Sequence, residues 1–204
     1  MKAVAILLVG ILFTTQLCAQ DIKLPEPQKT GGMPLMEALN LRKTDRDFSP
    51  KELDNQLLSN LLWAANGINR PDGRRTAPTA RNMQQIDIYL YFPTGVYLYM
   101  PKENSLKFIV AGDHRKEAAK QEFAQKAPLI MVFVANYDKM NCDEECRTFY
   151  GATDCGNVSQ NVYLFCASEK LYTVALGMID REAITKLLKI NGKPILGQPV
   201  GFPK

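Results

Sequence analysis

Segments between residues 86 and 136 carry the hydrophobic patterns of β-strands, and these patterns constrain the fold of the chain most strongly. In IDIYLYF (86–92) and VYLYM (96–100) the residues alternate between two kinds of side chain across a short PTG turn, which predicts a hairpin whose strands have two different faces. SLKFIVAG (105–112) predicts a third strand. The continuous apolar run LIMVFVAN (129–136) predicts a strand that is buried on both faces.

Helical patterns occupy most of the remaining chain. We expect helices because apolar residues recur there at helical spacing between capping and turn residues. The segment TFYGATDCGNVSQNVYLFCASEK has many small residues, which suit close packing in a core or at a subunit interface. A sheet with segregated helices is an α+β arrangement. The predicted helices cover residues 34–44, 49–67, 113–127, 148–170 and 180–190.

The second of these helices has the clearest start and stop signals. Ser49 is expected to be its N-cap, Pro50 lies in its first turn, and Glu52 completes a capping box. Gly67 is expected to end it. The next stretch, INRPDGRRTAPTARN (68–82), is a long loop, and loops of this length are usually functional or disordered.

The first 19 residues have the pattern of a secretory signal peptide. A short basic start precedes an apolar stretch that is too short to span a bilayer, and a cleavage site is expected after Ala19. Cys18 raises the alternative of a lipid anchor, although Leu17 is not the small residue that such cleavage prefers. We therefore expect an exported protein with a flexible lead at residues 20–33 and one folded domain at residues 34–204.

The charge pattern narrows the class of partner. The net charge is +4 and the isoelectric point is near 8.7, but basic and acidic residues are interspersed along the chain. Because no basic block is present, nucleic acid is an unlikely partner class. No second segment of the sequence predicts membrane insertion.

Four cysteines remain after the leader. In an exported protein disulfides persist, and Cys142 and Cys146 are close enough to bridge. Cys155 and Cys166 lie in an apolar helical run and are expected to be buried thiols. A four-thiolate metal site is the third alternative, but the spacing matches no usual zinc pattern, so we expect no metal.

The segment LRKTDRDFS (41–49) places Arg42 and Arg46 at a spacing that brings like charges together on a helix. That arrangement costs roughly 0.2–0.5 kcal/mol unless an anion lies between them. The alternative is a solvated face on which Asp45 and Asp47 are the local partners.

Four stretches in this order carry a resemblance to a known family: LRKTDRDFS; LLWAANGI with RRTAPTARNMQ; DCGNVSQNVYLFCASEKLYTVALGMID; and PVGFP. The chain resembles the nitroreductase-like FMN flavoproteins, particularly the branch that includes thiazole- and oxazole-forming peptide dehydrogenases. The resemblance implies a central, mostly antiparallel sheet flanked by helices, in a homodimer with two FMN sites at the interface. One departure is Lys170-Leu171-Tyr172, where relatives usually carry Gly-Leu-Gly.

The resemblance also implies which residues hold FMN. Arg42 and Arg46 would bind the phosphate, since guanidinium groups offer forked donors to its oxygens, and Asn82 would bond the flavin ring through its amide. Backbone N–H groups of Gly177 and Met178 would face the flavin N5 and O4 edge. The full predicted set is Arg42, Lys43, Thr44, Arg46, Asn82, Gln84, Gly177, Met178 and Lys204.

The implied activity is that of an FMN-dependent oxidoreductase. Its donor is either NAD(P)H or another reductant, because NAD(P)H is scarce outside the cytoplasm. Electrons would pass through FMN to an electron-poor small molecule such as a nitroaromatic or a quinone, and no side chain would act as a catalytic residue. The alternatives are a flavin-binding protein without turnover and a dehydrogenase of peptide-derived heterocycles. A thiol–disulfide protein built on Cys142 and Cys146 is a remote third alternative.

Overall fold

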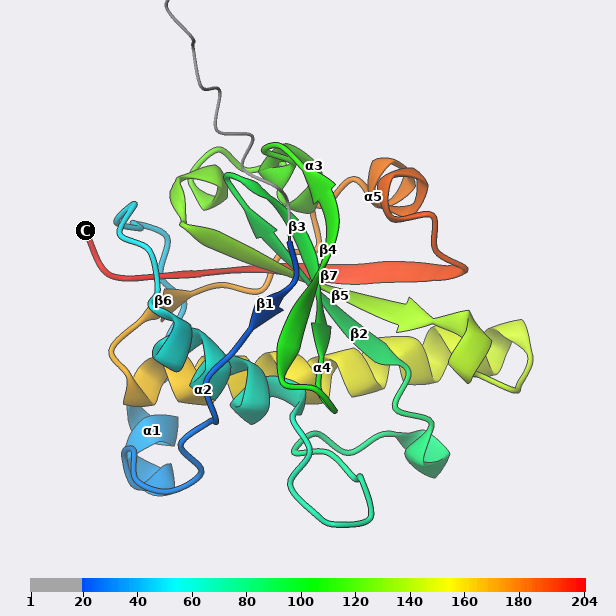
Figure 1. Ribbon diagram of the computed structural model, residues 1–204, viewed down its shortest axis with the longest axis horizontal. Helices are drawn as coiled ribbons and strands as arrows, with labels where there is room; N and C mark the ends of the chain where they lie inside the picture. Colours follow the sequence, from blue (N-terminus) through cyan, green and yellow to red (C-terminus); the bar gives the residue numbers. More distant parts are fainter. Residues whose placement is uncertain (1–19) are drawn as a thin grey trace, which may run out of the picture.

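The computed structural model describes residues 20–204, so the predicted signal peptide lies outside the described residues. A seven-stranded sheet forms the centre, in the order β1-β4-β3-β2-β5-β7-β6, and all neighbouring strands are antiparallel (Figure 1). The predicted α+β class is confirmed. The strands are β1 (Ile22–Lys23), β2 (Ile86–Phe92), β3 (Gly95–Met100), β4 (Ser105–Ala111), β5 (Leu129–Asn136), β6 (Tyr172–Thr173) and β7 (Gly192–Gly201).

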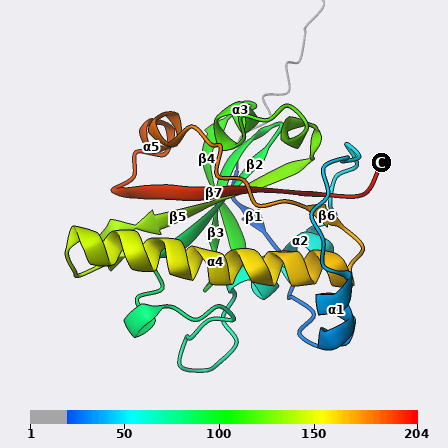
Figure 2. The same ribbon diagram turned by 180° about the vertical axis from the view of Figure 1, so that it is seen from behind.

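Helices cover both faces of this sheet, as Figures 1 and 2 show from opposite sides. Two separate groups of buried apolar residues result: one lies under α2 and α4, and the other lies between the sheet and α3 and α5. Strand β5 contributes to both and is buried from Leu129 to Ala135, as its continuous apolar sequence predicted. The helices are α1 (Leu35–Leu41), α2 (Asn55–Asn66), α3 (Arg115–Ala118), α4 (Glu144–Ser168) and α5 (Arg181–Leu188).

Helix α2 begins later than the sequence predicted. Its N-cap is Asp54, whose side chain accepts a hydrogen bond from the Leu57 N–H at 2.8 Å. Ser49 is not the cap, because its own N–H donates to the Phe202 carbonyl and the segment after it remains non-helical. The predicted stop is correct: the Gly67 N–H caps the helix by donating to the Trp63 carbonyl.

Helix α1 is also shorter than predicted, and this changes the geometry of the arginine pair. It ends at Leu41, and Arg42 has an extended backbone. Residues 42–47 then run without regular structure because they contact distant segments, as described below. Arg42 and Arg46 are therefore not one helical turn apart, and the predicted helical extent to residue 44 is wrong.

The lead at residues 20–33 is not the flexible segment that the sequence predicted. Ile22 and Lys23 form β1 by pairing with Leu106 and Ser105 of β4. The Pro25 carbonyl accepts hydrogen bonds from two side chains of the folded domain, those of Ser59 and Asn104. These contacts hold the lead against α2 and the sheet.

The predicted helix at residues 113–127 breaks into two short pieces. Only α3 and a single 3-10 turn, η2 (Ala124–Lys126), are helical. The Asp113 carboxylate accepts from the backbone and the guanidinium of Arg115, and this pairing holds the pKa of Asp113 below its ordinary value. Helices α4 and α5 cover most of their predicted ranges, although α4 begins four residues earlier, and Asp180 caps α5 by accepting from the Ala183 N–H.

Lys170, the first residue of the Lys-Leu-Tyr departure, keeps a backbone conformation that favours glycine. Its φ is +57°, in the left-handed region directly after α4. The glycine geometry is therefore retained there by a lysine, at a steric cost. Among the helices of residues 20–204, none is both long enough and apolar enough to cross a bilayer.

Candidate functional site

The segment from Arg42 to Phe48 lies along one end of the sheet and is fixed by distant parts of the chain. The Asp45 N–H donates to the Thr173 carbonyl, and Phe48 forms a bridge with Pro203. The Lys204 N–H donates to the Asp47 carbonyl at 3.2 Å. The predicted phosphate ligands therefore lie on two adjoining segments of the chain. One carries Arg42, Lys43, Thr44 and Arg46, and the other carries Lys204.

Aromatic rings support the cations of this segment. The Arg42 guanidinium lies 5.3 Å from the centroid of the Tyr163 ring, and the Arg46 guanidinium lies 5.9 Å from that of Phe123. Within the described part of the chain neither arginine has a carboxylate at ion-pair distance, whereas Lys43 pairs with Asp45 at 3.3 Å. The solvated-face alternative required nearby carboxylates to neutralise the two guanidinium groups. The carboxylates do not do so. Their supporting rings belong to opposite sides of the sheet.

Tyr163, on α4, connects this segment to the next part of the predicted site. Its hydroxyl accepts a hydrogen bond from the Ala175 N–H at 2.8 Å and lies 3.3 Å from the Thr44 hydroxyl. One phenol therefore positions both the arginine segment and the start of the turn at residues 174–178. Sequence reasoning missed Tyr163, because an aromatic residue on a long helix is typical of simple packing.

The turn that carries Gly177 and Met178 is exposed and held from behind. Leu176 bridges to Gly197 of β7, and the Arg181 guanidinium donates to the Gly177 carbonyl at 3.2 Å. The Met178 carbonyl accepts from the Lys120 N–H. In residues 20–204 no acceptor contacts the N–H groups of Gly177 and Met178, so both remain available to a ligand. The Met178 side chain is 60% exposed.

A cavity of about 260 Å³ lies beside the arginine segment. Its walls come from the end of α1, the C-terminal half of α4 and strand β6. Apolar and aromatic groups predominate on these walls, and they include the Tyr163 and Tyr172 rings, with Lys43 and Asp45 at the arginine side.

The loop that carries Asn82 and Gln84 contacts the middle of α4, at Asp154 and Asn157. Arg81, Asn82 and Gln84 all have φ near +50°, in the left-handed region that non-glycine residues avoid. The Gln84 side chain accepts from Arg75 Nε at 2.9 Å and donates to the Gly73 carbonyl and to Asn82 Oδ1. Gln84 therefore supports the loop in which the sequence analysis placed it as a cofactor-binding residue.

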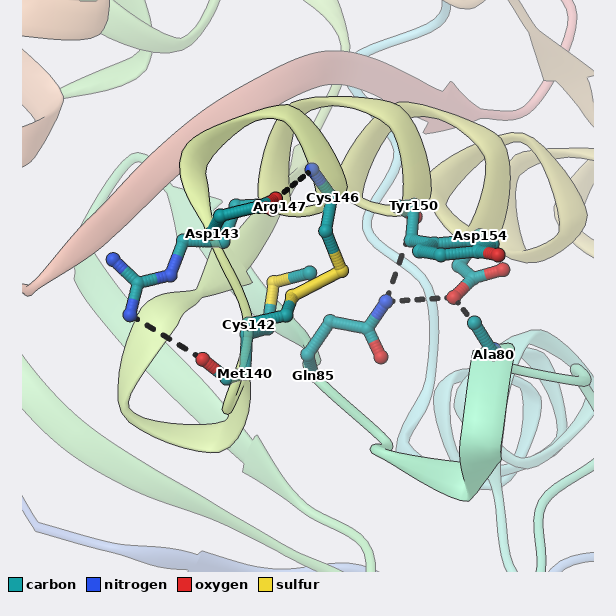
Figure 3. The surroundings of a disulfide bond; sticks show 9 residues. All are labelled: Ala80, Gln85, Met140, Cys142, Asp143, Cys146, Arg147, Tyr150 and Asp154. Carbon is teal, nitrogen blue, oxygen red and sulfur yellow. Dashed lines mark hydrogen bonds between the residues drawn. A yellow bond between two sulfur atoms is a disulfide. The ribbon is translucent and has the colours of Figure 1, made fainter.

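A buried carboxylate holds this loop to α4, as Figure 3 shows. Asp154 Oδ2 accepts from Gln85 Nε2 at 2.6 Å and from the Ala80 N–H at 2.9 Å. Asp154 is only 4% exposed. Sequence reasoning missed it, although a signal existed: Asp154 occupies the same helical stripe as buried residues Gly151 and Val158.

The two parts of the predicted site contact different parts of α4. Asp154, beside the Asn82 loop, and Tyr163, beside the arginine segment, are separated by about 13 Å along the α4 axis. The structure therefore groups Arg42, Lys43, Thr44, Arg46 and Lys204, places Gly177 and Met178 on a turn linked to them through Tyr163, and leaves Asn82 and Gln84 apart.

Of the three alternatives for the cysteines, the structure shows the local disulfide and the buried thiols. Cys142 and Cys146 form a disulfide across the start of α4, with their Cα atoms 6.0 Å apart (Figure 3). Cys155 and Cys166 are free and buried, and burial raises the pKa of the Cys155 thiol to about 12. No cluster of three or more metal-ligating side chains occurs between residues 20 and 204.

Comparisons with known proteins agree on one family. The model of the nitroreductase family matches residues 39–202. A Methanocaldococcus jannaschii protein that is named as a nitroreductase is 32% identical to this chain over 192 residues. The match covers 89% of this chain and 96% of that protein. The crystal structure of a Ralstonia eutropha protein that is also named as a nitroreductase is 39% identical, with a TM-score of 0.85. The match covers 91% of this chain and 90% of the other.

A more distant structure shares the fold. The NADPH:FMN oxidoreductase from Vibrio harveyi, solved in complex with NAD+, is 18% identical, with a TM-score of 0.63. The match covers 83% of this chain and 69% of that one.

Proposed function

This chain belongs to the nitroreductase family, and from that premise we propose that it is an exported, FMN-dependent oxidoreductase. The family supports a nitroreductase-type oxidoreductase, and the FMN oxidoreductase of Vibrio harveyi shares the fold. The proposed acceptor is an electron-poor small molecule such as a nitroaromatic or a quinone. NAD(P)H is the proposed donor.

The observation that carries this proposal is the arginine pair. Within residues 20–204 Arg42 and Arg46 have ring support but no carboxylate at ion-pair distance, and Lys204 adjoins their segment through its backbone. This donor set suits a phosphate dianion, because guanidinium groups bind phosphate oxygens in forked pairs. Residues Arg42, Lys43, Thr44, Arg46 and Lys204 would hold the phosphate end of FMN.

The exposed N–H groups of Gly177 and Met178 suit the other end of the cofactor. They have no protein acceptor in the described residues, and Arg181 and Lys120 hold the turn from behind. Backbone donors stabilise negative charge that develops opposite them. When bound, FMN supplies the two-electron transfer chemistry. The protein's own contribution is to bind FMN, to orient it and to leave one face open to substrate.

We expect the complete site to need a second copy of the chain. Asn82 makes no contact with the arginine segment in residues 20–204, and a partner would bring further groups to the space between them. Helix α1 leaves large apolar side chains unpartnered, since Leu35 is 62% exposed and Met36 is 76% exposed. The outer face of α4 carries small or short residues, including Ala152 and exposed Gly156, which permit close approach of a second helix.

Export is proposed from the sequence of residues 1–19. The Cys142–Cys146 disulfide supports it, because disulfides persist in oxidising compartments. NAD(P)H is scarce outside the cytoplasm, so the donor is the part of the proposal that most needs a direct test.

The test is a visible absorption spectrum of the chain purified from residue 20 onward. We expect a yellow protein with flavin absorption that bleaches when NADH or NADPH is added anaerobically and returns when a nitroaromatic or a quinone is added. A yellow protein that no donor bleaches would instead indicate a flavin-binding protein without turnover. A folded protein that takes up no FMN from excess cofactor would refute the proposal.

A further inference from the structure

A second cavity opens where two neighbouring strands separate. Strand β2 pairs with β5 from Ile86 to Tyr91, but its pairing with β3 starts only at Tyr89. Strand β3 meanwhile stays paired with β4 as far as Met100. From Ile86 to Ile88, where β2 is not paired with β3, the two strands diverge, as Figure 1 shows at the lower edge of the sheet. The cavity at this opening measures about 480 Å³, within the range of pockets that hold small molecules, roughly 300–1,000 Å³.

One side of this cavity is apolar and the other is charged. Ile86, Ile88, Leu98 and Met100 provide side chains of the diverging strands. The Asp87 carboxylate also lies here, but the Lys139 ammonium and the Asn136 amide already bind it. This pair is therefore internally neutral. Lys102 and Glu103 also line the cavity and carry opposite charges, so the lining keeps one net positive charge.

Arg75 supplies the uncompensated charge. Its Nε donates to Gln84 Oε1 at 2.9 Å, and its Nη1 donates to the Asn66 carbonyl at 3.0 Å, so the guanidinium is held rigidly. Across residues 20–204 it has no carboxylate at ion-pair distance, and its Nη2 donates to no protein acceptor. Burial lowers the pKa of Arg75, while Tyr99 and Asp87 act in the opposite direction. Arg75 is half-buried, so its free Nη2 can be reached by a ligand in the cavity.

Two other polar groups around the cavity lack partners. The Tyr99 residue is 4% exposed, and its hydroxyl, which is itself accessible to solvent, makes no hydrogen bond to the described residues. Burial raises the pKa of Tyr99 to about 12, so the phenol remains protonated and can donate. Asn66 is 2% exposed, and its Oδ1 accepts no hydrogen bond. Buried polar groups are normally satisfied, and each exception needs an explanation.

We propose that this cavity is a binding site for a small organic acid with an apolar or aromatic body. The carboxylate would accept from Arg75 Nη2 and from the Tyr99 hydroxyl, and the body would contact Ile88 and Leu98. A carboxylate matches a guanidinium with a free edge, because both groups are planar and the hydrogen bonds are charge-assisted. The apolar wall excludes a bare inorganic anion as the best ligand.

This site is independent of the proposed flavin function. None of its lining residues belongs to the predicted cofactor set, and the two meet only through the Arg75–Gln84 hydrogen bond. Binding of an acid here can therefore be measured whether or not the protein holds FMN.

The experiment titrates the FMN-saturated protein with sodium benzoate, its uncharged analogue benzamide and inorganic phosphate, followed by backbone amide chemical shifts. We expect benzoate to shift the amides of Ile88 and Tyr99, with at least about tenfold tighter binding than benzamide or phosphate. Shifts confined to the Gly177 turn would place benzoate at the flavin site and overturn the proposal. Equal binding of benzoate and benzamide, or tighter binding of phosphate, would also overturn it.

Three variants localise the binding. Tyr99→Phe removes only the phenol oxygen, and we expect about fivefold weaker benzoate binding. Arg75→Gln is expected to remove detectable binding, and its fold is verified by circular dichroism because Arg75 also braces the loop. The matched control is Arg74→Gln, since Arg74 precedes it in the same loop and pairs with Asp72. Unchanged binding in a folded Arg75→Gln or in Tyr99→Phe would refute the assignment.

Discussion

The C-terminal half and the middle of helix α4 hold the two parts of the predicted site by different physical means. At the C-terminal half, Tyr163 positions a chain segment through one hydroxyl and one ring, and in that segment Lys43 and Arg46 are exposed while Arg42 is half-buried. In the middle, Asp154 binds the loop through a buried carboxylate, and the loop backbone is strained. The first region is built to receive a ligand, whereas the second is built to hold a fixed shape.

Strain of this kind is informative because it persists only where surrounding contacts enforce it. Each residue at positive φ costs on the order of 1–3 kcal/mol, and such residues cluster at functional sites. The Arg81, Asn82 and Gln84 conformations are held by Asp154 and by the Gln84 side chain. The difference between the two regions predicts that substitutions in the first will affect ligand binding and those in the second will affect stability.

The largest expected effect is on FMN binding at the first region. Replacing Arg42 and Arg46 together by alanine removes both phosphate donors, and we expect FMN affinity to fall at least about 100-fold, near 3 kcal/mol. The measurement is an FMN titration followed by flavin fluorescence. Lys51→Ala is the control, because Lys51 is an exposed cation stacked on Phe202 at 4.3 Å outside this segment. A double variant with native affinity would disprove the phosphate assignment.

The second region should respond in stability. Asp154→Ala leaves the Gln85 amide and the Ala80 N–H without their acceptor, and we expect a loss of about 3 kcal/mol in the free energy of unfolding. Asp154→Asn retains one carbonyl acceptor and should lose less. Urea denaturation measures both, with Gln160→Ala, an exposed position on the same helix, as the control. If Asp154→Ala were as stable as the control, the carboxylate would not be what holds the loop.

The disulfide near the second region should contribute less. Replacing Cys142 and Cys146 by serine opens a very short covalent loop, for which chain entropy predicts a loss of about 2 kcal/mol. Denaturation of the wild type with and without a reductant gives the same comparison independently. Electron transfer to the acceptor should be unchanged in the variant. Loss of that activity in a folded variant would favour the thiol–disulfide alternative.

A smaller effect is expected for the hydroxyl of Tyr163. Tyr163→Phe keeps the ring under Arg42 but removes the acceptor of the Ala175 N–H, so we expect a loss of about 1 kcal/mol in stability. FMN affinity should fall about fivefold, since the turn at residues 174–178 loosens. Tyr150→Phe is the matched control on the same helix, because no hydrogen bond to the Tyr150 hydroxyl occurs in the described chain. Equal behaviour of the two variants would remove Tyr163 from a positioning role.

The smallest effect concerns the glycine-like conformation after α4. Lys170→Gly relieves roughly 1–2 kcal/mol of left-handed strain and adds up to about 1 kcal/mol of unfolded-state entropy, so we expect a net gain near 0.5 kcal/mol. Thermal unfolding measures the change. Lys186→Gly, within α5, should instead destabilise by about 1 kcal/mol. A destabilised Lys170→Gly variant would show that its side chain makes a compensating contact.

The sheet and the long helix could be predicted because their sequences report burial directly. The alternation in residues 86–92 and the apolar run in residues 129–136 both reappear in β2 and β5. The start of α2 could not be predicted, because Ser49 and Asp54 both have capping side chains and only a distant contact, with Phe202, decides between them.

The site was predictable by residue type but not by geometry. The arginines were identified from their segment, yet the end of α1 depends on contacts with Thr173 and Pro203, more than a hundred residues away. Tyr163 and Asp154 act through hydrogen bonds to distant segments, which no local pattern encodes. The separation of the Asn82 loop from the arginine segment follows from tertiary structure alone.

The position of β7 has a consequence for biosynthesis. This strand, Gly192–Gly201, lies between β5 and β6, and so joins segments synthesised long before it. Until those residues leave the ribosome, β5 has one edge without a partner, and the nascent polypeptide stays incompletely folded. Any chain that lacks β7 therefore presents a free edge of β5, which can pair with a strand of another molecule.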